Sequence, residues 1–421
     1  MSSPYMFFNT NTKEEKMITA GIDSGRRIIS VSYVEDGEEI AYKEYENSFT
    51  GYRELEEDMR DTGVEVVCIE GHGDSSRQAA VYLYEKGYKI YEINPLMLLK
   101  LKESMTEKKT DHIDAYVCGM FPFIRKDMKP LVLSIRVQDL KRLVRLYEKI
   151  SKQVVRYKNQ LHGELHQVFG CKYREVFSSI SRTSLRFFSS FSTPEEVMGA
   201  DIEEIQEVLK AGGSCMYRGK YGRDKAARIK EVLTEGYDEE LKLSTEVGGT
   251  MIKTLCRILM SLTKEKEEIK RKIERNVEEL YSGYKEHFRG IRLSSLRFGQ
   301  IMAEIQDIDR FPDDGHLASY AGQAPVQKQS GDRNMMKNKK KYYNRHLAHV
   351  IHQLACSNVQ KGAKYHEYYS ILKKKFNKPL RALKTIKRKL IRDLYSGLVN
   401  YSSNLHQTDT PSNRSYSLTG S

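Results

Sequence analysis

The sequence lacks a long apolar run and a charged-then-apolar leader. A helix that spans a membrane needs about 20 consecutive apolar residues, so we expect neither a membrane protein nor a secreted one. Cysteines are few: six occur in 421 residues, and no Cys-x-x-Cys pair is among them. We therefore expect reduced, mostly buried cysteines in a cytoplasmic protein, with neither a disulfide framework nor a zinc site.

Positive charge, in contrast, is abundant and unevenly distributed. The 70 Lys and Arg residues outnumber the 57 Asp and Glu residues, which gives a formal charge of +13. Residues 1–120 carry 14 basic against 23 acidic side chains, whereas residues 328–404 carry 19 against 3. The simpler alternative is that each set of charges is only a solvated face. The difference in net charge between the two segments, however, favours a metal-holding catalytic domain joined to a domain that binds a polyanion.

The length predicts two or three domains, and the first has a mixed α/β pattern. An Asp36-Gly37 turn signal between two strand candidates indicates a tight hairpin. The order β-β-β-α-β-α-β-α is an RNase-H-like topology, which we assign to a domain over residues 17–124. Its strands are expected at 17–23, 27–34, 38–45, 64–70 and 88–93, and its helices at 50–61, 75–86, 96–103 and 111–121.

The middle of the chain, residues 125–285, is predicted to be helical. Two long stretches, near 140–168 and 251–281, have narrow apolar stripes between many charges. This pattern is typical of an antiparallel hairpin or coiled coil, so we expect an oligomerisation region. The glycine pairs at 212–213 and 248–249 are interpreted as turn signals in a helical insertion between the two stretches.

The last third is predicted to form a mostly α-helical domain over residues 288–404. Helices are expected at 344–358 and 380–402, and a Gly/Pro-punctuated loop from 322 to 331. Residues 405–421 are rich in Ser, Thr and Asn and are predicted to be a disordered tail.

Four carboxylates stand where this topology brings strand ends together. Asp23 ends the first strand and Glu70 ends the fourth, and these two strands are neighbours in an RNase-H-like sheet. Asp111 and Asp114 lie three apart and share one face of a helical turn. Each alone has an ordinary alternative as a turn or capping residue. Together they would repel one another unless a cation neutralised them, and such oxygen ligands suit Mg²⁺ or Mn²⁺.

At these residues the chain resembles the DEDD transposases of insertion sequences, the "one-ten" family, which includes the Piv-type DNA invertases. The resemblance in the first domain rests on Gly21-Ile22-Asp23, Ile69-Glu70, Ile93-Asn94-Pro95 and Lys109-Thr110-Asp111-His112-Ile113-Asp114-Ala115. In the last domain it rests on Ile305–Phe311, Leu317–Gly322, Pro325 and Gln329-Ser330-Gly331. Tyr343–Ala348 stands where the family usually has Gly-Asn-x-x-Leu-Arg.

This resemblance implies a function that the composition alone does not. The first domain would be a RuvC-like DEDD catalytic domain, and the last a transposase domain with a nucleophilic serine, carried over to Ser330. The serine would form a phosphoserine link with DNA while the metal-bound carboxylates assist. The resemblance further implies a structured guide RNA that pairs with donor and target DNA, and dimers to tetramers in a prokaryotic, nucleoid-associated setting.

From the residues alone, Ser330 would be a turn serine in a loop, since no His or Asp partner stands at local spacing. The stretch that follows interleaves basic and aromatic side chains, which suits phosphate contact and stacking on bases. A solvated helix start is the alternative for that stretch. Its candidate nucleic-acid-binding residues are Lys337, Lys339, Lys340, Lys341, Tyr342, Tyr343 and Arg345.

Three further hypotheses remain at this point. The three-residue spacing of His346, His349 and His352 suggests a metal site. Among these histidines and the nearby Cys356, however, only His352 and Cys356 have the i, i+4 spacing that is usual for a pair of metal ligands on one helix. The whole chain could also be a metal-dependent nuclease or resolvase without covalent serine chemistry. Lastly, it could be a catalytically inactive nucleic-acid-binding derivative of a transposase.

Overall fold

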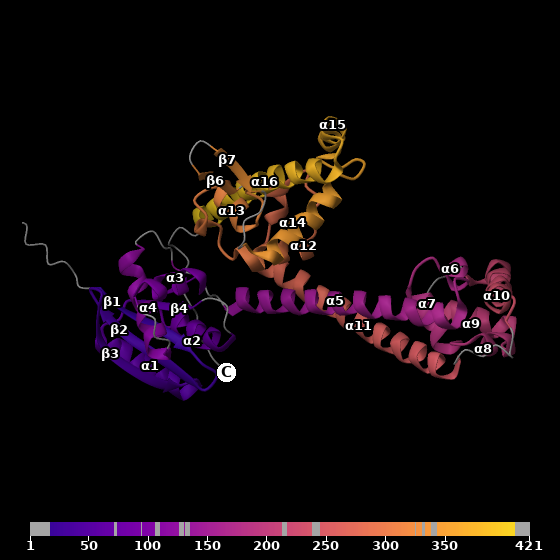
Figure 1. Cartoon of the computed structure of the whole chain (residues 1–421), viewed down its shortest axis with the longest axis horizontal. Helices are drawn as coiled ribbons and strands as arrows, with labels where there is room; N and C mark the ends of the chain where they lie inside the picture. The colour runs from indigo at the N-terminus through magenta and orange to yellow at the C-terminus, as the bar shows by residue number, and fades with distance from the viewer. Residues whose placement is uncertain are drawn as a thin grey trace, which may run out of the picture. The chain divides into compact units, whose positions relative to one another are not determined.

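The computed structural model divides the chain into two compact units, Met1–Asp139 with Gly283–Ser421, and Leu140–Ser282. Within the described part of the chain, no helix is both long and apolar enough to cross a membrane. The structure describes residues 17–408 apart from 71–73, 94, 106–109, 126–129, 131–134, 213–216, 238–244, 325, 331–332 and 338–342 (Figure 1).

A five-stranded mixed sheet forms the centre of the N-terminal domain (Figure 1). The strands follow the spatial order β3-β2-β1-β4-β5, with β1, β2 and β3 antiparallel and β4 and β5 parallel to β1. The predicted neighbourhood of the first and fourth strands is therefore confirmed, and the sheet fits an RNase-H-like fold. The strands are β1 (Ile18–Ser24), β2 (Ile28–Glu35), β3 (Glu38–Glu46), β4 (Val66–Glu70) and β5 (Lys89–Ile93).

Helices cover both faces of this sheet, as expected where parallel strands are joined by helical crossovers. On one face α1 (Phe49–Thr62) and α2 (Asp74–Glu85) pack through Leu55 and Leu83 against Ile22 and Ile69. On the other face α3 (Pro95–Met105) and α4 (Asp111–Ile124) pack against Val66, Cys68 and Ile93. Because side chains alternate along a strand, residues next to Ile22 and Ile69 point toward α3 and α4.

The backbone of α4 lies directly on β1. A Cβ atom on Gly21 would stand 2.0 Å from the carbonyl oxygen of Ala115 and 2.1 Å from the amide nitrogen of Gly119. The hydroxyl of Thr19 donates a hydrogen bond of 2.7 Å to the Gly119 carbonyl oxygen. Only glycine permits this approach, so Gly21 and Gly119 determine how closely α4 packs on the sheet.

Two long helices dominate the middle unit: α5 (Ile135–Phe169) and α11 (Thr245–Leu280). They run antiparallel, because the Lys266 ammonium lies 5.3 Å from the centre of the Tyr147 ring while Gly248 approaches Val168. Whether the pair supercoils and mediates oligomerisation stays a prediction. Between them lie α6 (Tyr173–Val176), α7 (Arg182–Ser190), α8 (Pro194–Gly199), α9 (Ile202–Ala211) and α10 (Gly219–Thr234).

The predicted turn at Gly248-Gly249 is wrong, because both residues lie inside α11. A Cβ atom on Gly248 would stand 2.6 Å from Val168 Cγ2, and one on Gly249 would stand 2.8 Å from Ser192 Oγ. These glycines allow close packing of the helix against its neighbours, which a single sequence does not distinguish from a turn. Gly212 does end a helix, α9, whereas Gly213 lies outside the described residues.

The C-terminal domain is mostly helical but contains one hairpin, of β6 (Val326–Ser330) and β7 (Arg333–Lys337). Ser330 therefore ends a strand and does not lie in the predicted loop, and it pairs with Arg333 across the hairpin. The strands lack the apolar alternation that identifies half-buried strands in a sequence. The helical elements are η3 (Tyr284–Phe288), α12 (Ser295–Ile305), η4 (Ile308–Arg310), α13 (Asp314–Tyr320), α14 (Arg345–Asn358), α15 (His366–Phe376) and α16 (Pro379–Thr408).

The end of the chain departs from the prediction in one respect. The last helix, α16, continues to Thr408, so the first four residues of the predicted disordered tail are helical. Residues 409–421 lie outside the described residues, and disorder there stays a prediction.

The packing of α4 on β1 predicts the effect of one methyl group. Gly21→Ala should lower the free energy of unfolding by about 3 kcal/mol, since its Cβ can be accommodated only by moving helix backbone. Urea denaturation measures this decrease. The control is Gly163→Ala within α5, where no atom lies within 4 Å of the new Cβ; it should raise stability by about 0.5–1 kcal/mol. Equal effects of the two substitutions would contradict the proposed packing constraint.

Candidate active site

Glu70 is the last residue of β4, and Asp23 lies one residue before the end of the adjacent parallel strand β1, which continues to Ser24. The register pairs Ile22 of β1 with Ile69 of β4, so the next residue of each strand, Asp23 and Glu70, occupies the same level of the sheet. Ile22 and Ile69 belong to the core under α1 and α2. Alternation then directs Asp23 and Glu70 to the opposite face, which α4 covers.

Asp111 and Asp114 stand in the first turn of α4. Thr110 is the N-cap, and its hydroxyl accepts a 3.2 Å hydrogen bond from the Ile113 amide. Asp111 is thus the first residue of the helix and not its cap. The exposed amides at a helix N-terminus favour negative charge, which partly offsets the cost of placing two carboxylates there.

The electrostatics connect all four carboxylates. Burial raises the pKa of Asp23 from 3.8 to about 6, and the negative charges of Asp111, Asp114 and Glu70 contribute to this rise, in that order of size. A carboxyl group that is half-buried and surrounded by like charges holds its proton to a higher pH. The other three predicted carboxylates therefore all interact electrostatically with Asp23.

A lysine that the sequence analysis missed also belongs to this site. Lys102, on α3, forms an ion pair with Asp114 through its ammonium group and Oδ1. The side chain of Lys102 is 12% exposed and that of Asp114 is 20% exposed. One sequence feature points to this ion pair. Lys102 stands four residues after Leu98 and so shares its helix face, and Leu98 packs in the core between α3 and α4.

The donor set fits a hard divalent cation, since it consists only of carboxylate oxygens. Among the described residues, however, no three His, Cys, Asp or Glu side chains are close enough to hold one ion. Asp114 is engaged by Lys102, so metal binding needs side-chain rearrangement. His112 is directed elsewhere: its Nε2 lies 2.9 Å from the Glu39 carboxylate, and its ring packs on Tyr42.

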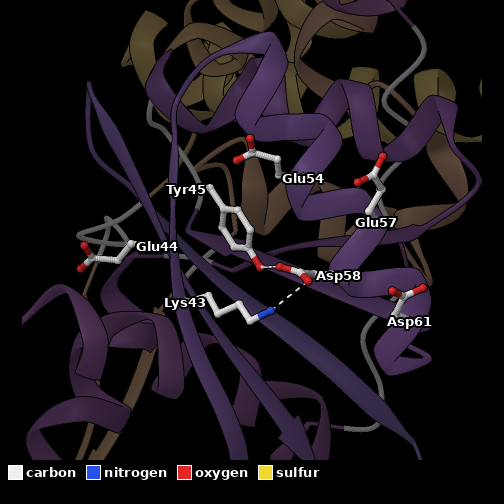
Figure 2. A pocket seen from close by; sticks show the side chains of 7 residues that line it. All are labelled: Lys43, Glu44, Tyr45, Glu54, Glu57, Asp58 and Asp61. Carbon is white, nitrogen blue, oxygen red and sulfur yellow. Dashed lines mark hydrogen bonds and ion pairs between the residues drawn. The ribbon is translucent and has the colours of Figure 1, made fainter.

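A second acidic surface is separate from these four carboxylates. A hollow of about 520 Å³ between β3 and α1 is lined by five acidic side chains, with Tyr45 and Lys43 (Figure 2). Asp58 accepts a 2.6 Å hydrogen bond from the Tyr45 hydroxyl and lies 2.8 Å from the Lys43 ammonium. Tyr45 and Lys43 thus engage Asp58, and the hollow contains none of the four carboxylates of the candidate site.

The two segments that flank the Ser330 hairpin are joined by a hydrogen-bond network. The Asn344 side-chain amide donates to Glu304 Oε2 at 2.7 Å and to the Tyr320 hydroxyl at 2.9 Å. The backbone amide of Asn344 also donates to the Tyr320 carbonyl oxygen at 2.8 Å. A Cβ atom on Gly322, at φ +66°, would stand 2.5 Å from the Tyr343 ring. Tyr320 and Asn344, which precede and follow the hairpin in the sequence, therefore lie next to each other.

In the stretch Tyr343–Ala348, Asn344 and Leu347 match the family pattern, and both have structural roles. Asn344 caps α14 by accepting a 2.9 Å hydrogen bond from the Leu347 amide, and Leu347 is buried. Both residues thus serve folding. Arg345 is exposed at the start of α14, and the Tyr343 side chain is 36% exposed. Lys337 ends β7, whereas Lys339, Lys340, Lys341 and Tyr342 lie outside the described residues.

The histidines of α14 do not assemble into a described metal site. The Cys356 sulfur lies 3.8 Å from His352 Nε2, but the described residues offer no third ligand to this pair. Burial and the positive charge of Lys387 lower the pKa of His352. The helix buries Leu347, Val350, Ile351 and Leu354, which agrees with its interpretation as a core helix.

Comparisons with known proteins agree at both ends of the chain. A family model of DEDD transposases of the IS110 type matches residues 20–170, and a model of the transposase IS116/IS110/IS902 family matches residues 293–370. The mini-circle putative transposase for IS117 of Streptomyces coelicolor is 22% identical over 351 residues, spanning 76% of this chain and 79% of the relative. T. thermophilus RuvC in complex with a Holliday junction substrate aligns with 27% of this chain and 99% of its own, at 16% identity and a TM-score of 0.23.

Two separate transposase domains on one chain define the class of this protein: it is a DNA transposase, an enzyme that recombines DNA. The chain belongs to the IS110 family of DEDD transposases.

The raised pKa of Asp23 predicts how stability depends on pH in the metal-free protein. Because its folded pKa of about 6 exceeds 3.8, the folded state binds more protons between these values, and stability should fall as pH rises from about 4 to about 6. Asp23→Asn should therefore raise the Tm above pH 7 in EDTA and leave it unchanged near pH 3.5. Thermal melts test this, with the exposed Asp224→Asn as control. A parallel pH profile for wild type and Asp23→Asn would contradict it.

Proposed function

We propose that this transposase cuts and rejoins DNA at Asp23, Glu70, Asp111 and Asp114, with Ser330 as the nucleophile. The observation that carries the proposal is that β1, β4 and α4 bring four carboxylates within electrostatic reach of one another, so that burial and, after it, the charges of Asp111, Asp114 and Glu70 raise the pKa of Asp23. Such convergence costs stability, and functional sites are where proteins retain such costs.

The two pairs of carboxylates would divide the work of holding Mg²⁺ or Mn²⁺. Asp23 and Glu70 offer oxygens from the rigid sheet, while Asp111 and Asp114 offer oxygens from the first turn of α4. When bound, such ions stabilise the charge that develops on attacking and leaving oxygens of a phosphodiester. The close packing of Gly21 on Gly119 supports this role, since it limits movement of α4 relative to the sheet.

Ser330 would attack the DNA phosphorus through its hydroxyl oxygen. A serine–phosphorus bond forms as the bond to a deoxyribose oxygen breaks, and that oxygen takes the proton released by the serine. In the reverse step a DNA hydroxyl attacks the phosphoserine, so the strand is rejoined without an external energy source. Support comes from the Gln329-Ser330-Gly331 motif and from the position of Ser330 at the end of β6.

DNA and a structured guide RNA are the proposed nucleic-acid partners, and dimers to tetramers the proposed assembly. The strong positive charge of residues 328–404 supports polyanion binding, and the exposed Arg345 is part of it. The antiparallel α5 and α11 supply long helical surfaces that suit oligomerisation. RNA guidance rests on the family resemblance.

The test of the proposed chemistry is a covalent protein–DNA link. Wild-type protein incubated with its RNA, labelled DNA and Mg²⁺ should give a labelled band that resists boiling in detergent, and Ser330→Ala should not. Asp23→Asn with Glu70→Gln should also abolish the band. Ser370→Ala, on α15, should retain it. A band that persists in Ser330→Ala would identify another nucleophile, and strand exchange with no band would indicate direct attack by water or a DNA hydroxyl.

Nucleic-acid binding should depend steeply on salt concentration. Replacement of Lys337, Lys339, Lys340 and Lys341 with Gln should flatten the plot of log K against log salt for duplex DNA by about 0.9 for each phosphate that the variant no longer neutralises. Fluorescence anisotropy at several salt concentrations measures this slope. Lys86→Gln with Lys89→Gln, in the acidic N-terminal domain, serves as control. An unchanged slope in the quadruple variant would locate the phosphate-binding residues elsewhere.

A further inference from the structure

Lys102 reaches the acidic site from a helix that is firmly packed. Leu98, one turn earlier on α3, is 4% exposed and lies in the core cluster with Val117 and Phe121 of α4. Residues four apart share a helix face, so the packing of Leu98 directs Lys102 toward α4 as well. The ion pair with Asp114 therefore follows from the packing of α3 and not from a freely mobile surface lysine.

The surroundings of this ammonium are strongly acidic. A lysine side chain is seldom buried as far as 12% exposure unless it is paired. Its partner Asp114 is one of four carboxylates that interact electrostatically, and the ammonium of Lys102 is the cation that the described residues bring to Asp114. In the absence of a metal ion, this pairing reduces the repulsion within the site.

We propose that Lys102 is the resident counter-ion of the acidic site and competes with a divalent metal ion for Asp114. This inference rests on the proposed metal-binding function of the four carboxylates. The ammonium already pairs with Oδ1 of Asp114, and its positive charge would repel a metal ion that binds the same carboxylate. Metal binding must therefore displace Lys102, which its flexible four-carbon stem permits.

The experiment compares two lysines of the same helix in the full-length protein. Lys102→Met keeps a long apolar side chain and removes the charge, and Lys100→Met does the same at an exposed position of α3. Isothermal titration with Mn²⁺ should show a Kd about tenfold lower for Lys102→Met than for wild type, since a competing and repelling charge is removed. The Kd of Lys100→Met should equal that of wild type.

Thermal melts give a readout that a merely structural ion pair would not produce. Lys102→Met should lower the Tm in EDTA, because Asp114 is left without its partner, but should have little effect at saturating Mn²⁺. The metal-induced rise in Tm should thus be larger in the variant than in wild type. Equal lowering of the Tm with and without Mn²⁺ would overturn the proposal and leave Lys102 as a structural link between α3 and α4.

A double-mutant cycle tests whether Lys102 acts through Asp114. In an Asp114→Asn background, Lys102→Met should no longer tighten Mn²⁺ binding, whereas a long-range charge effect would persist and would overturn direct competition. The outcomes also separate this inference from the proposed function. Mn²⁺ binding that is absent, or insensitive to Asp23→Asn and Glu70→Gln, would overturn the metal site itself. Binding that needs Asp23 and Glu70 but ignores Lys102→Met would overturn only the role of Lys102.

Discussion

The near-contact of two backbones, at Gly21 of β1 and Gly119 of α4, is the constraint on which the rest of the N-terminal domain depends. No side chain separates the helix from the sheet there, and the Thr19 hydroxyl adds a hydrogen bond to the Gly119 carbonyl oxygen. The helix cannot slide without a clash or a broken hydrogen bond. Its first turn, with Asp111 and Asp114, is therefore held at a fixed height above the end of β1.

This rigidity has an electrostatic cost, which the surrounding residues reduce in different ways. Burial and, after it, like charges that cannot move apart raise the pKa of Asp23, so the metal-free domain is less stable at neutral pH than it would be with a neutral side chain there. The amides at the start of α4 and the ammonium of Lys102 both lower the cost. The binding of the divalent cation that we propose would recover the free energy that this repulsion costs.

Local patterns predicted most of the N-terminal domain. The strands expected at 17–23 and 64–70 are present and adjacent, and they place Asp23 one residue before the end of β1 and Glu70 at the end of β4. The Lys102–Asp114 pair could not be found in this way, because it joins two helices whose packing is a tertiary property. The β6–β7 hairpin was missed because its polar strands carry no core-facing alternation, and Gly248 was misinterpreted because its role is close helix packing.

The two residues near Asn344 that match the family pattern have structural roles. Asn344 caps α14 and Leu347 fills the core, and the Asn344 side-chain amide also donates a hydrogen bond to the buried Glu304. A buried carboxylate needs its hydrogen-bond donors, so this position tolerates little change. The tie between Asn344 and Tyr320 closes the base of the segment that carries Ser330. A hydroxyl at the end of β6 whose segment is tied at its base can occupy fewer positions, and such restriction would favour the attack on a bound phosphate that we propose for Ser330.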